Sequence, residues 1–197
     1  MRHRDEQAVT EEPTDRKEWD GDEYQQRIDR MAATGTDMHG EADVVVGLEP
    51  SSVLDAGCGS GRVARELAHR AIEVVGVDPD RSMIDAARRQ APELTWVVAD
   101  MVDVELGRTF DVVVMAGNVP LFTPAGTQAG LVAGCRRHLV HGGYLVAGFQ
   151  LGRGYTVAEY DEHSALVGLT RTARWSSWSS EPFTADSGYA VSIHRVA

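Results

Sequence analysis

Residues 52–61, Ser-Val-Leu-Asp-Ala-Gly-Cys-Gly-Ser-Gly, decide the fold of this chain. Ser52 to Leu54 form a short apolar, β-branched run that is typical of a buried strand. Asp55 ends the run, three glycines follow at alternate positions, and a helical pattern begins at Arg62. Such a turn brings bare backbone close to a ligand and directs the free N–H groups of the helix start toward it. The stretch therefore predicts a small-molecule site, whereas a single glycine would indicate only a tight turn.

Composition narrows the class of protein. The chain has 197 residues and a net charge of −11, which argues against binding to phosphate backbones and to anionic lipid. Arginine supplies 18 of the 19 basic residues, and the only lysine is Lys17, so lysine chemistry is nearly excluded from the core. Cys58 and Cys135 form no disulfide framework, and there is neither a signal-peptide pattern nor a membrane-length apolar run. We therefore expect a cytoplasmic protein.

The pattern beyond the glycine turn alternates strand and helix. Apolar runs without polar alternation predict parallel strands covered by helices on both faces, whereas the last two predicted strands alternate like a hairpin. The predicted strands cover residues 52–54, 73–78, 94–99, 110–116, 144–149, 169–176 and 189–196. The predicted helices lie within 19–33 and over 41–47, 62–70, 82–91, 127–139 and 157–167, and His141-Gly142-Gly143 is read as a turn. The sequence thus predicts a parallel sheet finished by an antiparallel hairpin.

Several polar features fall at the carboxyl ends of these strands, where such sheets bind ligands. Asp78 follows Gly57 by 21 residues, the spacing at which a carboxylate can accept both hydroxyls of a ribose. The alternative for Asp78 is a helix cap, but Asp80 and Ser82 can serve that purpose unaided. Asp100 can accept from an adenine amine or cap a turn. These features predict an adenosine site.

With these features, the chain resembles class I S-adenosylmethionine-dependent methyltransferases. Five motifs carry the resemblance in order: Val-Leu-Asp-Ala-Gly-Cys-Gly-Ser-Gly-Arg, Val-Val-Gly-Val-Asp-Pro-Asp-Arg-Ser-Met, Val-Ala-Asp-Met, Phe-Asp-Val-Val-Val-Met-Ala-Gly-Asn-Val and His-Leu-Val-His-Gly-Gly-Tyr-Leu. They cover about half of the chain, and the whole chain from Tyr24 is similar to small bacterial members of unassigned substrate. The resemblance implies a Rossmann-like three-layer sandwich with a mostly parallel seven-stranded sheet and an antiparallel C-terminal hairpin strand. It also implies S-adenosyl-L-methionine as cofactor and S-adenosyl-L-homocysteine as product.

The resemblance assigns cofactor-binding roles by position. It implies that the methionyl part lies on the glycine turn, the ribose at Asp78, the adenine near Met83 and Asp100, and the sulfonium near Asn118. Arg27 is a candidate partner for the cofactor carboxylate. The full set implied is Arg27, Asp55, Ala56, Gly57, Gly59, Asp78, Pro79, Met83, Asp100, Met101, Ala116, Gly117 and Asn118.

The sequence departs from the family at two places. His141 replaces the proline of the usual Pro-Gly-Gly, and Gly-Asn-Val-Pro is not the Asn/Asp-Pro-Pro-aromatic motif of members that methylate nucleic acids or glutamine. Methyl transfer needs mainly alignment, so the catalytic residues stay unassigned, with His39, Asn118 and Tyr155 as candidates and His163 as a weaker one. The histidines at 138 and 141 lack companion ligands, and no metal is expected.

We therefore expect a disordered acidic tail over residues 1–18 and a single methyltransferase domain over 19–197. Its parts are an N-terminal helical cover (19–47), a cofactor-binding core (52–150) and a C-terminal helix and hairpin (151–197). A cover this short favours a small-molecule acceptor and no nucleic-acid or membrane partner. Two alternatives stay open: a nicotinamide-dependent oxidoreductase, and a non-catalytic module that binds an adenosine cofactor.

Overall fold

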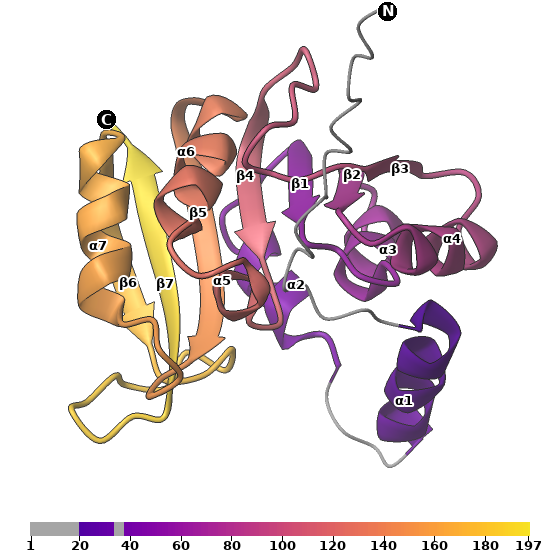
Figure 1. Ribbon diagram of the computed structural model, residues 1–197, viewed down its shortest axis with the longest axis horizontal. Coiled ribbons are helices and arrows are strands. Elements are labelled where there is room, and N and C mark those ends of the chain that lie inside the picture. Colours follow the sequence, from indigo (N-terminus) through magenta and orange to yellow (C-terminus); the bar gives the residue numbers. More distant parts are fainter. Residues whose placement is uncertain (1–19, 34–37) are drawn as a thin grey trace, which may run out of the picture.

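The computed structural model describes residues 20–33 and 38–197 of the chain (Figure 1). The strands are β1 (Ser52–Ala56), β2 (Glu73–Asp78), β3 (Thr95–Val98), β4 (Phe110–Met115), β5 (Leu139–Gln150), β6 (Leu169–Trp175) and β7 (Tyr189–Val196). The helices are α1 (Gly21–Ala33), α2 (Gly40–Val46), α3 (Arg62–His69), α4 (Arg81–Gln90), α5 (Val119–Phe122), α6 (Gln128–Arg137) and α7 (Val157–Leu166). The tail predicted over residues 1–18 lies outside the described residues. In the described part of the chain, no helix is long and apolar enough to cross a membrane.

The strands form one sheet of seven in the order β3-β2-β1-β4-β5-β7-β6. Neighbours pair in parallel from β3 through β5, whereas β7 pairs antiparallel with both β5 and β6. In this register, Leu54 of β1 lies between Val75 of β2 and Val113 of β4. The predicted fold class, a mostly parallel seven-stranded sheet with an antiparallel C-terminal hairpin strand, is confirmed.

Two apolar cores lie on the two faces of the sheet, because successive residues of a strand point to opposite sides. Val53 packs into the core beneath α2, α3 and α4, and Leu54 packs into the core beneath α6 and α7. Both residues are fully buried. Strands that are buried on both faces consist of continuous apolar runs, and for this reason the positions of these strands could be predicted from the sequence.

The fifth strand is the element whose start was predicted wrongly. His141-Gly142-Gly143 was expected to be a turn before the strand, but β5 already begins at Leu139 and includes it. Phe110 pairs with Leu139 and Val112 pairs with Tyr144, so the register shifts and the glycine pair is accommodated as an irregularity in the ladder.

A second element, α5, was not predicted at all. It is a single turn of four residues directly after β4, with Pro120 in its first turn. A proline there is tolerated because the N–H it lacks would have no partner within the helix. This short helix forms one wall of the site described below.

The first helix, α1, packs against α4 (Figure 1), and its residues line the site together with those of the glycine turn. The contact begins at Gly21, whose backbone N–H donates to the Ser82 hydroxyl at 3.2 Å. A Cβ at this position would lie 2.3 Å from the Ser82 carbonyl oxygen, so only glycine allows this approach. The helix was predicted from the spacing of Tyr24, Ile28 and Met31, and these residues line the site.

Candidate functional site

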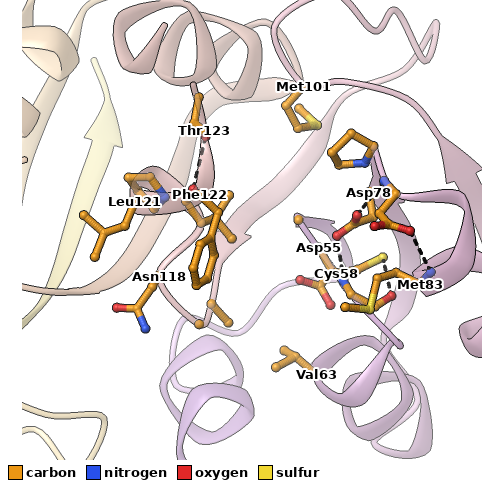
Figure 2. A pocket seen from close by; sticks show the side chains of 18 of the residues that line it. Asp55, Cys58, Val63, Asp78, Met83, Met101, Asn118, Leu121, Phe122 and Thr123 are labelled. Atoms are coloured by element: carbon orange, nitrogen blue, oxygen red, sulfur yellow. Dashed lines mark hydrogen bonds between the residues drawn. The ribbon is translucent and has the colours of Figure 1, made fainter. Parts of the chain in front are cut away.

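A cavity of about 860 Å³ lies at the carboxyl ends of the parallel strands, within the size range of small-molecule sites. Its walls come from α1, the glycine turn, the ends of β2 and β3, α5 and the loop after β5. Figure 2 shows the labelled side chains in two groups: Asp55, Asp78, Met83 and Met101 toward one end, and Asn118, Leu121, Phe122 and Thr123 toward the other. The predicted edge of the sheet is therefore where the structure has its cavity.

The glycine turn is shaped for close approach. Gly57, Gly59 and Gly61 all have positive φ angles, 77°, 54° and 83°. A Cβ at Gly57 would lie 2.6 Å from Cγ2 of Val119, so the turn packs directly under α5. The backbone N–H groups of Gly57 and Cys58 donate to the Val77 carbonyl at 2.8 and 3.0 Å. These two bonds tie the turn to the end of β2.

Asp55 is buried at the end of β1 and lines the cavity. Its Oδ2 accepts the backbone N–H of Ala64 at 3.1 Å, which anchors the first turn of α3. Burial raises the pKa of Asp55 to about 7; nearby Asp78 and Glu41 add to the rise, and Arg62 opposes it. The charge of this carboxyl group therefore changes near neutral pH.

Asp78 ends β2 and holds the turn in place. Its Oδ2 accepts the Gly59 N–H and its Oδ1 accepts the Asp80 N–H, both at 2.9 Å. The helix cap itself is made by Asp80, which accepts from the N–H groups of Ser82 and Met83. The structure thus places Asp78 at the cavity, and Asp80 makes the helix cap, one of the two capping residues that the sequence offered.

The adenine-side residues of the prediction line the same end of the cavity. Asp100 follows β3, and its Oδ1 accepts the Val102 N–H at 2.9 Å. Pro79, Met83 and Met101 contribute apolar surface there, and the two methionines are almost fully buried. Polarizable thioethers of this kind suit a flat ring.

Asn118 lines the site between β4 and α5. It has a φ of 72°, an uncommon conformation for a residue other than glycine. Its Oδ1 accepts the Gln150 N–H at 2.7 Å, and its own N–H donates to the Gly148 carbonyl at 3.1 Å. These bonds join the end of β4 to the end of β5. Ala116 and Gly117 also line the cavity here.

Two predicted site residues lie elsewhere. Ala56 is fully buried in the core beneath α6 and α7, and its side chain is not part of the cavity wall. His39 precedes α2 and its Nδ1 lies 3.2 Å from Oε2 of Glu66 on α3, outside the cavity. His39 was expected near the site because it lies between the two N-terminal helices, but the carboxylate on α3 holds it on the outer side.

Tyr155 follows β5 and lines the cavity, whereas His163 stands behind it on α7. The Tyr155 hydroxyl lies 2.9 Å from Nδ1 of His163, and the two rings are stacked at 5.7 Å. Burial raises the pKa of Tyr155 well above its ordinary value, and the Glu159 and Asp161 carboxylates add to the rise. The phenol is therefore neutral at physiological pH and acts as a hydrogen-bonding group.

Sequence reasoning missed three parts of the site. Glu41 on α2 pairs with Arg62 on α3 through both carboxylate oxygens, and both residues line the cavity. Leu121 and Phe122 of α5 form an apolar wall, and Arg153 lies in the loop between β5 and α7. The only sequence signal for α5 was Pro120 in its first turn. Neither a single arginine such as Arg153 nor an ion pair between residues 21 positions apart, such as Glu41 and Arg62, produces a local sequence pattern.

The fold is that of an α/β protein with a cavity at the carboxyl edge of its sheet, and comparisons with known proteins identify the class. A sequence profile described as "Methyltransferase domain" matches residues 53–143. The chain is 34% identical to a TehB-like SAM-dependent methyltransferase from Corynebacterium glutamicum, with a TM-score of 0.85, over 90% of this chain and 98% of that one. The chain belongs to the S-adenosylmethionine-dependent methyltransferases.

More distant relatives share the fold or the core. The amino pentose methyltransferase CalS10 from Micromonospora echinaspora, solved with SAM bound, has a TM-score of 0.73 at 20% identity over 87% of this chain and 96% of that one. A dTDP-3-amino-3,4,6-trideoxy-alpha-D-glucopyranose N,N-dimethyltransferase from Streptomyces venezuelae is 32% identical over 50% of this chain and 42% of its own length. The chain spans less than half the length of this and several other curated relatives.

The residues present fit the cofactor of this family. S-adenosylmethionine carries a cationic sulfur, a ribose and an adenine but no phosphate. Carboxylates of Asp55, Asp78 and Asp100 surround the cofactor end of the cavity, and the described residues that line the cavity include no lysine. The glycine turn leaves room that a Cβ would fill. In the described ranges, no group of three or more His, Cys, Asp or Glu side chains has the arrangement of a metal site.

Proposed function

We propose that this protein transfers the methyl group of S-adenosylmethionine to a small-molecule acceptor. The observation that carries this proposal is the cavity at the carboxyl edge, where three strand-ending carboxylates and a positive-φ glycine turn meet in a chain of this family. A phosphate-bearing cofactor, as the oxidoreductase alternative requires, would meet these acidic groups unfavourably.

We assign the cofactor-binding roles as follows. The carboxylate of Asp78, which lines the cavity at the end of β2, binds the ribose hydroxyls. Asp55 and the turn at Gly57 and Gly59 bind the methionyl part, with Arg27 of α1 at its carboxylate. The adenine lies among Pro79, Met83, Asp100 and Met101, and Ala116, Gly117 and Asn118 lie beside the sulfur.

When bound, S-adenosylmethionine supplies the methyl group: the acceptor's lone pair forms the new bond to the methyl carbon while the carbon–sulfur bond breaks and its electron pair stays on sulfur. The protein's task is to hold the three atoms in line. Asn118 fixes the position of the β4 end through its bonds to Gln150 and Gly148. Tyr155 lines the acceptor side and His163 stands behind it, so the Tyr155 oxygen can take up the proton that the acceptor loses while the phenol passes its own proton to Nδ1 of His163.

Isothermal titration of S-adenosylmethionine and S-adenosylhomocysteine tests the assignment. Asp78→Ala should weaken binding by about tenfold to a hundredfold, because a charge-assisted pair of hydrogen bonds is lost. Asp186→Ala, at an exposed position of the β6–β7 link, is the matched control. Asp78→Asn, which keeps an acceptor for the Gly59 N–H, separates ribose binding from a change in the turn. Unchanged affinity in the alanine variant would refute the role of Asp78, and tight NADH binding without S-adenosylmethionine binding would refute the function.

We also propose that residues 19–197 form a single domain and that the protein acts in the cytoplasm. The single domain is supported by one sheet whose two cores extend from α2 to β7. The location is supported by two free cysteines, both buried. Limited proteolysis that leaves a fragment starting near residue 19 intact, and fractionation of the cells that produce the protein, test these two points.

A further inference from the structure

The cavity has a second half whose chemistry differs from that of the cofactor end. We define this acceptor half as the lining residues from 118 to 131 and from 153 to 155. Within it, Leu121, Phe122 and Leu131 supply apolar surface. Among the described residues that line this half, Arg153 is the only charged one, whereas the carboxylates of the described lining all come from the other half.

The guanidinium of Arg153 is accessible to a ligand that enters the cavity from solvent. It lies in the loop between β5 and α7, is exposed, and its Nη1 donates to Oε1 of Gln150 at 3.3 Å. Gln150 in turn donates its backbone N–H to Asn118. A guanidinium has five N–H donors in a planar fork, so one such bond leaves a bidentate carboxylate site. These contacts place the guanidinium beside the end of β5 that Asn118 also contacts.

The two other arginines of the cavity belong to the cofactor end. Arg62 is engaged by Glu41 and also donates to the Met38 carbonyl. Arg27 packs on the Tyr24 ring at 4.9 Å, and Cε1 of Tyr24 lies 3.7 Å from where a Cβ of Gly59 would be. This places Arg27 over the glycine turn. Arg153 is thus the arginine left for a ligand in the acceptor half.

We propose that the methyl acceptor is a small aromatic or apolar carboxylate, an inference that rests on the proposed function. Its carboxylate pairs with Arg153, and its apolar body lies against Leu121 and Phe122. Its hydroxyl or amine faces Asn118, where it gains the methyl group and loses a proton. A net charge of −11 repels anions in general, so a single cation in an apolar half-site discriminates sharply between an acid and its uncharged analogue.

Binding of matched pairs to the S-adenosylhomocysteine-saturated protein tests the proposal. The probes are 4-hydroxybenzoate, 3-(4-hydroxyphenyl)propanoate and 4-aminobenzoate, each compared with its primary amide by calorimetry. At least one acid should bind about tenfold more tightly than its amide. Arg153→Gln should bring that ratio close to one, and Arg195→Gln, on β7 opposite Tyr144 and therefore at the other end of β5 from Gln150, should leave it unchanged.

The outcomes separate this inference from the proposed function. If S-adenosylhomocysteine binds with equal affinity to wild type and Arg153→Gln while the acid preference disappears, the inference is supported. If no acid is preferred over its amide, or if the preference survives in Arg153→Gln, the acceptor class is wrong and the methyltransferase assignment stands. If Arg153→Gln instead weakens cofactor binding, Arg153 serves the cofactor carboxylate and the inference is overturned. Failure of the wild type to bind the cofactor at all contradicts the proposed function first.

Discussion

The two halves of the cavity are held in place in different ways. At the cofactor end, Asp55 and Asp78 are both buried and accept backbone N–H groups of Ala64, Gly59 and Asp80. At the acceptor end, the wall is a single helical turn in which Phe122 is 52% exposed. A substitution at the cofactor end therefore disturbs both the glycine turn and the strands that carry it. A substitution at the acceptor end changes only an exposed wall of the cavity. Cofactor binding therefore depends on residues that also hold the fold together, whereas acceptor choice depends on residues that the fold does not need.

The largest effect should come from Gly57, where the two halves meet. In Gly57→Ala, the new Cβ would lie 2.6 and 2.8 Å from the two methyl groups of Val119, at a φ of 77°. We expect a loss of about 3 kcal/mol in the free energy of unfolding, from overpacking and from the left-handed backbone conformation. Urea denaturation measures it.

Two further variants divide this loss into its causes. Gly168→Ala has a similar φ, 76°, but its Cβ would meet nothing within 4 Å, so it should cost only the backbone part, about 1 kcal/mol. Adding Val119→Ala to Gly57→Ala should recover part of the stability. If Gly57→Ala costs no more than Gly168→Ala, the tight contact between the turn and α5 does not exist in solution.

An intermediate effect should come from the titration of Asp55. With a pKa of about 7 in the free protein, this carboxyl group is mostly protonated at pH 6 and mostly ionised at pH 8. A cationic ligand prefers the ionised form, so affinity for S-adenosylmethionine should rise by up to about tenfold between these pH values, with release of a proton on binding.

Asp55→Asn provides the comparison for this pH dependence, since the amide oxygen can still accept the Ala64 N–H. At pH 8 the affinity of this variant for S-adenosylmethionine should be lower than that of the wild type, and it should change little between pH 6 and pH 8. Calorimetry in two buffers with different ionisation enthalpies counts the protons directly. A wild-type affinity that falls as the pH rises from 6 to 8 would contradict both the raised pKa and the contact with a cation.

The difference between the halves also explains what the sequence could predict. The cofactor end is coded locally: an apolar run, a carboxylate and alternate glycines each specify backbone conformation within a few residues, and Asp55, Gly57 and Asp78 indeed meet in the cavity. The His39–Glu66 pair depends on how α2 lies on α3, and no local pattern records that packing.

Other errors have the same origin. The glycine pair at 142–143 was read as a turn because glycines are typical of turns, but Leu139 before it and Tyr144 after it both pair with β4, so the strand continues through it. Four residues of α5 are too few for a helical period to be detected. Arg153 lies between two glycines, and its meaning appears only when the fold brings its loop beside α5.

The smallest effect should come from Phe122, and it tests directly whether the acceptor half is independent of the cofactor end. Its half-exposed ring covers the acceptor half without filling the core. Once an acceptor is in hand, Phe122→Ala should raise its KM about threefold to fivefold, because part of the apolar contact with the acceptor is lost. The Kd for S-adenosylmethionine should stay the same, because Phe122 comes from α5, in the group of side chains across the cavity from Asp78 and Met83 (Figure 2). Leu166→Ala, at an exposed apolar residue at the end of α7, is the control for nonspecific loss of hydrophobic surface. A variant that binds the cofactor several times more weakly would mean that α5 supports both halves, and the separation between a built-in cofactor site and an added acceptor surface would not hold.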